Sequence, residues 1–497
     1  MFKKVLVANR GEIAVRVMQT LQQMGICAVA VYSQTDRGSL HAALADEAHA
    51  LPGASAAESY LRGERILEIA RAAGCEAIHP GYGFLSENED FAQACADAGI
   101  VFIGPRPEAI RAMGDKVLAK QTMAAAGVPV VPGWSGDIST PVDAIRHEAA
   151  GIGYPLLVKA AAGGGGKGMR LVQDEYELAA ALEAAAREAQ AAFGDGRVFL
   201  ERYLARPRHV EFQIFGDRLG HYVHLFEREC SIQRRYQKII EETPSPALTP
   251  ALRSAMGDAA VRAARAIAYD NAGTVEFLVD DAGNFYFLEV NTRLQVEHPI
   301  TEVTLQQDLV RAQLLAAAGE PLPFSQETLH SHGHAIECRV CAEDPAANFL
   351  PSIGTLRRFR PPVGPYIRVD SGVAEGSTVT VHYDSLLAKL VVWGRDRGEA
   401  VERTLWALRQ FVVLGVTTNI EFLARIIDAP EFRAGRVHTH FLDEHLRLRE
   451  PPAEVPDEAI VLAAWAAQTA GTGAVGGGGR ADEPIGPWST AGGWRAF

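Results

Sequence analysis

The stretch that decides the fold reads PLLVKAAAGGGGKGMR, from Pro155 to Arg170. It starts as an apolar strand, passes through consecutive glycines and continues into a second strand pattern over 169–172. Because glycine lacks a Cβ atom, backbone amides there can close around phosphate oxygens, and the flanking Lys159 and Lys167 add positive charge. The glycines concerned are Gly163, Gly164, Gly165, Gly166 and Gly168. We therefore expect a glycine hairpin that folds over a nucleotide.

Two better-known phosphate-binding patterns fit this stretch less well. It satisfies GxGxxG trivially, and Gly168 stands where a Walker A loop needs Ser or Thr for magnesium. Both of those designs lead from the loop into a helix, whereas this loop leads into a strand. A flexible surface loop is the alternative, although a linker does not require lysines on both sides of its glycines.

Composition limits the classes of protein to consider. The 497 residues are 48% hydrophobic and 22% charged, which predicts several domains. A formal charge of -13 disfavours a nucleic-acid-binding protein, because gripping a phosphate backbone needs surplus Lys and Arg. Six irregularly spaced cysteines indicate reduced thiols and, with no signal-peptide core or apolar run long enough to span a membrane, a cytoplasmic location.

The pattern of apolar runs predicts a mixed α/β and α+β multidomain fold. The first hundred or so residues alternate strand and helix patterns, which indicates a doubly wound parallel sheet. An α+β region follows, and a β-rich region begins near Gly333. After Leu446 come a Pro-rich piece, a helix near 458–467 and a Gly-rich linker over 470–479. The main strand candidates are 5–8, 28–32, 77–78, 101–103, 155–160, 169–172, 198–200, 210–215, 274–279, 285–290, 335–340, 378–381 and 386–392.

Two carboxylates are placed to face each other. Glu276 lies six residues before Ala282 and Glu289 six after Gly283, so a hairpin turning there sets them nearly opposite on one face. Opposed acids cost stability unless a cation lies between them, and two carboxylates with phosphate oxygens suit magnesium. At period two from Glu289, Asn291 and Arg293 share its face. Solvated acids on an outer face are the alternative.

A basic run and a cysteine pair are weaker signals. Arg208, His209 and the run from Gln233 to Lys238, which includes Tyr236, suggest local anion binding in an acidic protein, with a solvated face equally compatible. Cys338 and Cys341 form a single CxxC without a second pair, so we expect these two thiols only to pack.

Several ordered motifs resemble biotin carboxylase of the ATP-grasp superfamily. They are ANRGEIA from Ala8, HPGYGFLSEN from His79, GDK from Gly114, the glycine stretch, EVNTRLQVEHP from Glu289, ECR from Glu337 and HYDS from His382. The resemblance implies a doubly wound N-terminal domain over 1–113, an ATP-grasp domain over 114–330 with a lid over about 130–203, and a β-rich C-terminal domain over 331–446. Residues 447–497 would be a helical and Gly-rich linker with the start of a following domain.

The resemblance also implies roles for individual residues. Lys116, Lys159 and His209 would contact ATP phosphates or nearby nucleotide atoms, Glu201 and Leu204 would face the adenine, and Gln233 and Tyr236 would lie near the nucleotide. Glu276 and Glu289 would hold Mg2+ or Mn2+, with Asn291 nearby. Lys238, Arg293, Gln295 and Val296 would bind bicarbonate, Glu297 would act as its base, and Arg339 would stabilise the biotin enolate, with Tyr82 close by.

These roles describe the first half-reaction of an acyl-CoA carboxylase, in which ATP activates bicarbonate as carboxyphosphate and the carboxyl group passes to biotin. The implied partners are a biotin carrier domain or protein and a carboxyltransferase subunit, in a homodimer or larger complex, with neither nucleic acid nor membrane involved. Two departures from the family pattern stand out. Tyr236 replaces a usual histidine, and Thr304-Leu305-Gln306-Gln307 lacks a usual glycine, which we place at a helix entry.

The tail resembles the point where α subunits of acyl-CoA carboxylases, especially of the methylcrotonyl-CoA type, begin their middle domain. PWS from Pro487 and GGWR from Gly492 carry this likeness, and the family's biotin-attachment motif AMKM is absent from the sequence. Either the carrier is a separate chain or the sequence is a truncated α subunit, and we favour the latter. Two alternatives remain open, namely a non-catalytic scaffold of a carboxylase complex and another ATP-grasp ligase that joins a carboxylate to an amine.

Overall fold

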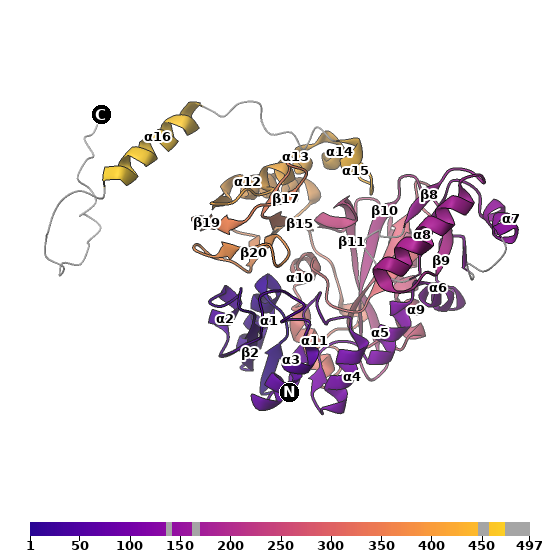
Figure 1. Cartoon of the computed structure of the whole chain (residues 1–497), viewed down its shortest axis with the longest axis horizontal. Helices are drawn as coiled ribbons and strands as arrows, with labels where there is room; N and C mark the ends of the chain where they lie inside the picture. The colour runs from indigo at the N-terminus through magenta and orange to yellow at the C-terminus, as the bar shows by residue number, and fades with distance from the viewer. Residues whose placement is uncertain (136–141, 162–168, 446–456, 473–497) are drawn as a thin grey trace. The chain divides into compact units, whose positions relative to one another are not determined.

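The computed structural model describes residues 1–135, 142–161, 169–445 and 457–472. The chain divides into two compact units, residues 1–449 and 450–497 (Figure 1). The described part of the second unit is the helix α16 (Asp457–Thr472), as expected near 458–467. The first three residues of the predicted Gly-rich linker, 470–472, belong to this helix instead. The rest of the predicted linker lies outside the described residues. No described helix is long and apolar enough to cross a membrane.

The N-terminal region forms a five-stranded parallel sheet in the order β3-β2-β1-β4-β5. The order reverses beside β1, which confirms the doubly wound arrangement. The edge strand β3 was not predicted, because alternate residues are half-buried and exposed and no apolar run marks it. The elements are β1 (Lys4–Val7), α1 (Gly11–Gln23), β2 (Cys27–Tyr32), α2 (Leu40–Leu44), β3 (Glu47–Ala50), α3 (Gly63–Ala72), β4 (Ala77–His79), α4 (Glu89–Asp97) and β5 (Val101–Phe102).

A four-stranded antiparallel sheet in the order β6-β9-β7-β8 carries the glycine stretch. Its strands β7 (Leu156–Ala160) and β8 (Arg170–Val172) pair antiparallel, which confirms the predicted strand-to-strand course. The intervening glycines 163–166 and 168 lie outside the described residues. The other elements here are α5 (Pro107–Gly114), α6 (Lys116–Ala125), β6 (Gly133–Ser135), α7 (Val142–Ile152), α8 (Leu178–Phe193) and β9 (Val198–Arg202).

The third sheet is antiparallel and eight-stranded, in the order β14-β13-β10-β11-β12-β15-β22-β20. It runs without a break across the boundary predicted at 331, because β12 pairs with β15. Its strands are β10 (Arg208–Gly216), β11 (Tyr222–Arg234), β12 (Gln237–Thr243), β13 (Asn271–Val279), β14 (Phe285–Asn291), β15 (His334–Cys341), β20 (Ile367–Ser371) and β22 (Leu386–Gly394). Helices packed on it are α9 (Pro250–Ala266), α10 (His298–Leu305), α11 (Leu309–Ala317), α12 (Arg397–Gln410) and α13 (Ile420–Asp428).

Alternation along β10 decides which side chains reach the site. Val210, Phe212 and Ile214 belong to one hydrophobic core cluster with residues of α9 and β13. His209 and Glu211 therefore point to the opposite face of the sheet, where the charged side chains gather. Short elements complete the unit: η1 (Gln326–Thr328), β16 (Glu343–Asp344), β17 (Leu350–Pro351), β18 (Gly354–Thr355), β19 (Arg358–Arg360), β21 (Thr378–Val379), β23 (Val412–Leu414), α14 (Pro430–Arg433) and α15 (Phe441–Glu444).

Cys338 is buried, as expected for a thiol that only packs. All six cysteines are free thiols, and Cys338 packs in a hydrophobic core cluster on β15. Within the described residues, neither Cys338 nor Cys341 belongs to a cluster that could hold a metal ion.

Candidate active site

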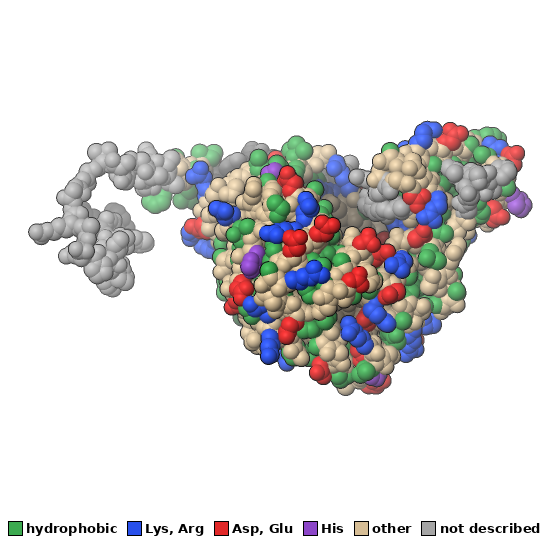
Figure 2. Space-filling view, turned by 60° about the horizontal axis from the view of Figure 1, so that its bottom comes forward, with side chains coloured by type: hydrophobic (Ala, Val, Ile, Leu, Met, Phe, Trp, Pro, Cys, Tyr) green, Lys and Arg blue, Asp and Glu red, His purple; other side chains and the backbone are tan. Residues whose placement is uncertain are grey.

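A cavity of about 630 Å³ opens on the polar face of the eight-stranded sheet and extends to the small sheet. Side chains from both sheets line it, and most of the residues selected from the sequence are among them. They are Lys116, Lys159, Glu201, Leu204, His209, Gln233, Tyr236, Lys238, Glu276, Glu289, Asn291, Arg293, Gln295, Val296 and Arg339. On the molecular face in Figure 2, Lys and Arg are interspersed with Asp and Glu, with no broad basic area suited to nucleic acid.

Among the predicted residues that the structure describes, two do not line this cavity. Glu297 is fully buried behind Lys238 and Arg339, and touches both. The hydroxyl of Tyr82 donates to Glu12, and its ring centroid lies 5.9 Å from the Nζ atom of Lys389. Tyr82 therefore reaches the site only indirectly, through Glu12 and Lys389.

Glu276 and Glu289 face each other on β13 and β14, as the hairpin prediction required. Leu288 is an extra residue in β14, because Phe277 pairs with Phe287 while Glu276 pairs with Glu289. Burial and the neighbouring Glu276 raise the pKa of Glu289 above its ordinary value. Two oxygen-bearing acids that oppose each other in this way fit a hard divalent cation such as Mg2+. The side-chain amide of Asn291 donates to Oε1 of Glu276 at 2.8 Å, so Asn291 lies beside this pair of acids.

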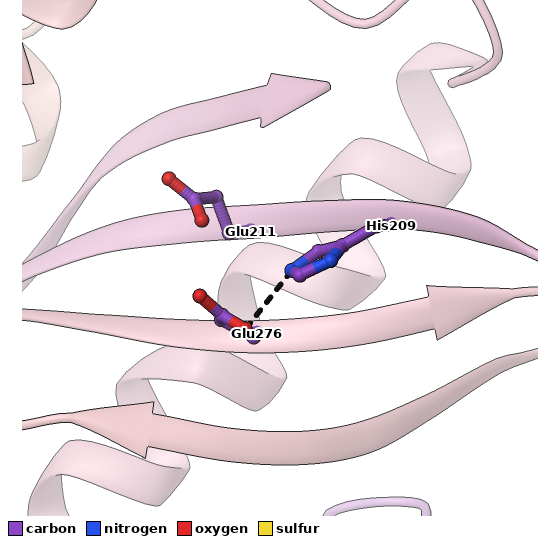
Figure 3. Close-up of side chains that lie close together, drawn as sticks. All are labelled: His209, Glu211 and Glu276. Carbon is purple, nitrogen blue, oxygen red and sulfur yellow. Dashed lines mark ion pairs between the residues drawn. The ribbon is translucent and has the colours of Figure 1, made fainter. Parts of the chain in front are cut away.

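His209, Glu211 and Glu276 form a second cluster on neighbouring strands (Figure 3). Their potential ligand atoms lie within 4.8 Å of one another, and Nε2 of His209 is 2.9 Å from Oε2 of Glu276. Burial alone would lower the pKa of His209, but the carboxylate of Glu276 outweighs it and the pKa is raised. Glu211 was missed in the sequence, although it follows His209 at period two on a predicted strand.

Lys238 lies at the centre of the charged residues. Its Nζ atom is 2.6 Å from Oε1 of Glu276 and 2.8 Å from Oε1 of Glu297, and it also contacts Glu211. Burial by itself would raise the pKa of Glu276 and Glu297, but Lys238 and other neighbouring cations hold the pKa of both carboxylates below the ordinary value. Lys238 therefore connects the proposed metal carboxylate with the proposed base.

Arg339 and Arg293 are each held by carboxylates. Arg339 lies 3.0 Å from Oε2 of Glu297 and donates through Nε to Glu241 at 2.7 Å. Arg293 donates to Glu87 at 2.8 Å, to Gln295 at 2.8 Å and to Asn291 at 3.0 Å. Glu87 and Glu241 were not selected from the sequence, because their contacts join segments far apart in the chain.

The other end of the cavity is cationic. Lys159 lies 2.5 Å from Oε2 of Glu201, whose other oxygen contacts Lys120 on α6. Nζ of Lys116 lies 3.9 Å from Glu289. Tyr236 is 59% exposed at the turn between β11 and β12, where its φ is 65°. Cations beside the opposed acids suit a polyphosphate ligand.

Comparison with known proteins identifies the fold. Models of the biotin carboxylase N-terminal domain, the carbamoyl-phosphate synthase L chain ATP binding domain and the biotin carboxylase C-terminal domain match residues 1–110, 115–325 and 337–444. The biotin carboxylase of Halalkalibacterium halodurans is 52% identical over 90% of this chain and 99% of its own length. The chain belongs to the biotin carboxylase family. The fold expected from the motif resemblance is thereby confirmed.

Other members of the family differ in the carboxylase to which they belong. A mitochondrial methylcrotonoyl-CoA carboxylase α subunit from Dictyostelium discoideum is 50% identical over 99% of this chain and 70% of its own length. This chain covers 60% of the Arabidopsis thaliana counterpart. A pyruvate carboxylase subunit from Methanothermobacter thermautotrophicus is 53% identical over 90% of this chain and 91% of its own.

Solved structures agree with this assignment. The biotin carboxylase domain dimer of Hydrogenobacter thermophilus 2-oxoglutarate carboxylase, in complex with MgADP, ADP and bicarbonate, has a TM-score of 0.87. It is 48% identical and is matched over 91% of this chain and 99% of its own length. Campylobacter jejuni biotin carboxylase, in a nucleotide complex, also has a TM-score of 0.87, with 44% identity over 90% of this chain and 99% of its own.

One departure from the family pattern has a structural account. Gln306 caps the C-terminal end of α10 with φ 55° and ψ 42°, in the left-handed region. The missing glycine therefore concerns the exit of α10 and not a helix entry as predicted. Asp308 caps the next helix separately, because its side chain accepts from the backbone NH of Arg311.

Proposed function

We propose that this biotin carboxylase uses MgATP to activate bicarbonate and transfers the resulting carboxyl group to biotin on a carrier domain. The observation that carries the proposal is the placement of Lys238 between Glu276, on the metal side, and Glu297, on the base side. One cation thereby touches both groups that an in-line attack of bicarbonate on a phosphoryl group would need.

Opposed Glu276 and Glu289, with Asn291, would hold the magnesium, which neutralises phosphate charge. Lys116, Lys159 and His209 would face the phosphates and nearby nucleotide atoms, while Glu201 and Leu204 would lie by the adenine, with Gln233 and Tyr236 near the nucleotide. These assignments agree with the cationic lining at that end of the cavity.

Lys238, Arg293, Gln295 and Val296 would bind bicarbonate, and Glu297 would remove its proton. In the described structure Lys238, Arg339 and Arg228 keep Glu297 ionised but weakly basic, although burial alone would raise its pKa. When bicarbonate takes up the charge of Lys238, Glu297 loses part of that stabilisation, so its pKa rises towards the range in which it can accept the proton. Arg339 would then stabilise negative charge on the biotin ureido oxygen.

The carrier, the carboxyltransferase and the final acceptor belong to the proposal as well. We favour methylcrotonyl-CoA or a related acyl-CoA, because the match to a methylcrotonoyl-CoA carboxylase α subunit extends over 99% of this chain. A pyruvate carboxylase subunit is 53% identical over 90% of the chain, so overall identity in the shared region does not by itself favour one acceptor. A homodimer within a carboxylase complex agrees with the dimeric structural relative. The cytoplasmic location stays a prediction.

The test is ADP release with Mg2+, bicarbonate and free biotin, compared with Glu297→Gln. Removing the base should abolish bicarbonate-dependent turnover while ATP binding changes little, because a general base acts in the transition state and Glu297 is not among the residues assigned to the nucleotide. Labelled bicarbonate should enter an acid-labile adduct of biotin. ADP release that is independent of bicarbonate in the unsubstituted protein would contradict the proposal, and label in a stable amide would indicate a carboxylate-amine ligase.

A further inference from the structure

Two buried glutamates face each other directly behind Arg339. The register of β12 and β15 pairs Glu241 with Glu337, and both side chains are fully buried. Oε1 of Glu241 accepts from Arg339. Oε2 of Glu241 and both carboxyl oxygens of Glu337 have no hydrogen-bond partner within the described part of the chain. Neither glutamate lines the cavity.

Two ionised carboxylates are unfavourable in this position. Directly opposed like charges repel, and an ionised carboxylate that is buried without donors loses its hydration without compensation. A carboxyl group that keeps its proton has an O–H donor and no charge, so it relieves both costs. Dyads of buried carboxylates commonly hold one proton between them for this reason.

The charged groups around Glu337 are already engaged. Lys389 on β22 donates to the carbonyl of Val296 at 2.7 Å and lies 3.2 Å from Glu12. Arg339, on the same strand as Glu337, is shared by Glu241 and Glu297. From α10, His298 bonds through Nδ1 to the carbonyl of Gln295, and burial holds its pKa well below the ordinary value. Lys389 and Arg339 still attract a charge on Glu337, but neither donates to it within the described chain, and burial outweighs their effect, so the pKa of Glu337 is raised.

Glu242 provides a contrast within the same strand. It is equally buried but accepts from His334 at 2.7 Å and from Arg397 at 2.7 and 3.1 Å. Burial would raise the pKa of Glu242, but these donors lower it to about 2. The two successive glutamates of β12 thus have opposite environments. Glu242 is ionised and held by two basic side chains, whereas Glu241 faces a second acid, Glu337.

We propose that Glu241 and Glu337 share one proton in the working enzyme and act as a positioning pair for Arg339. While the proton is present, the pair carries a single negative charge, and Arg339 can turn partly towards the cavity. When the proton is lost, a second charge draws the guanidinium back towards Glu241. Burial is the main cause that raises the pKa of Glu241 to about 7, and it also raises that of Glu337. The positioning role rests on the proposed function of Arg339, whereas the shared proton does not.

The first test compares Glu337→Gln with Glu242→Gln, two isosteric substitutions on neighbouring strands. Above about pH 4.5 the unfolded chain ionises residue 337 while the folded chain keeps the proton, so each pH unit lowers the ratio of folded to unfolded protein by about tenfold. A glutamine at position 337 cannot ionise, so this loss of stability with rising pH disappears in the variant. The melting temperature of Glu337→Gln minus that of the wild type should therefore increase from pH 5.5 to pH 8.

Glu242→Gln should melt below the wild type by a nearly constant amount across the same pH range. The pKa of Glu242 is depressed, so its contribution is fully present above about pH 4.5 and is lost only as the pH falls towards 2. If Glu337→Gln also melts below the wild type by a constant amount, Glu337 is ionised and the shared proton is disproved.

The second test follows the KM for free biotin from pH 7 to pH 9. In the wild type it should rise as the pair loses its proton, by at most about tenfold per pH unit, the limit for one titrating group. Glu337→Gln should flatten this rise. Equal profiles in the two proteins would overturn the positioning role even if the melting data support the shared proton. Failure of the proposed function would instead show as absence of bicarbonate-dependent ADP release in the wild type.

Discussion

The Nζ atom of Lys238 lies 2.8 Å from Oε1 of Glu297, and both side chains are almost completely buried. Lys238 also contacts Glu276 and Glu211, so one ammonium group serves three carboxylates. Buried charges of this kind depend on each other, because an uncompensated member is much more costly than the intact set.

Lys238→Met should abolish bicarbonate-dependent ADP release and destabilise the protein by about 3–5 kcal/mol near pH 8, the usual cost of breaking a buried ion pair. Burial already raises the pKa of Glu211, and losing Lys238 raises it further, so the folded state regains stability as the pH falls and a proton binds there. Melting curves at pH 6 and pH 8 should show the larger deficit at pH 8. Lys3→Met, at an exposed lysine, is the control and should change neither property.

Tyr236→His should introduce a pH dependence that the wild type lacks. A tyrosine phenol titrates near pH 10, so Tyr236, which is 59% exposed, stays neutral between pH 6 and pH 8. An imidazole at this position would titrate near pH 6.5. The KM for ATP of the histidine variant should therefore inflect near that pH, while the wild type shows no inflection from this residue. Tyr236→Phe removes only the hydroxyl group. If this hydroxyl forms a hydrogen bond with the nucleotide, its loss should raise the KM for ATP by about two- to tenfold.

Glu289→Gln should raise the free Mg2+ concentration needed for half-maximal activity by about tenfold, which corresponds to about 1.4 kcal/mol. The bound Mg2+ would lose one of its two anionic ligands, while Glu276 keeps its contacts with Lys238 and His209. Chelation of Mg2+ should stop turnover in both proteins. Asp281→Asn, at the exposed turn of the same hairpin, is the matched control, and an equal effect there would contradict the metal assignment.

Gln306→Gly should stabilise the protein by about 1 kcal/mol, because glycine enters the left-handed region without the Cβ clash that glutamine suffers. The next residue, Gln307, does not have a positive φ, so Gln307→Gly should instead be neutral or destabilising. Chemical denaturation of the two variants alongside the wild type measures the difference. Equal effects at both positions would show that the conformation of Gln306 carries no strain.

Local patterns in the sequence predicted the helices and strands well where apolar runs were long. The predicted pairing of Glu276 with Glu289 is also correct, but only because two deviations from the assumed hairpin cancel. Next to the turn, Val279 pairs with Phe285, so the hairpin is centred on Ala282, half a residue earlier than assumed. The extra residue Leu288 then shifts the register and makes Glu289 the partner of Glu276, as expected. A bulge of this kind leaves no signal in one sequence, because it depends on how neighbouring strands pack.

Contacts between distant strands could not be predicted from residue spacing. Glu241 meets Glu337 because β12 lies beside β15, and the spacing of residues within either segment carries no information about that register. Recognition of family motifs supplied Glu297 and Arg339, whereas the neighbours that set their charge, including Glu211 and Glu241, came only from the three-dimensional arrangement.

The unbroken sheet joins the proposed metal end of the cavity to the proposed biotin end. Glu276 on β13 and Arg339 on β15 are connected through β10, β11 and β12 by continuous backbone hydrogen bonds. A fragment ending near residue 330 would leave β12 as a bare edge, which promotes aggregation. Separate expression of the two halves should therefore fail, and the continuous sheet fixes the spacing between the two proposed sites, which the substrates would have to match.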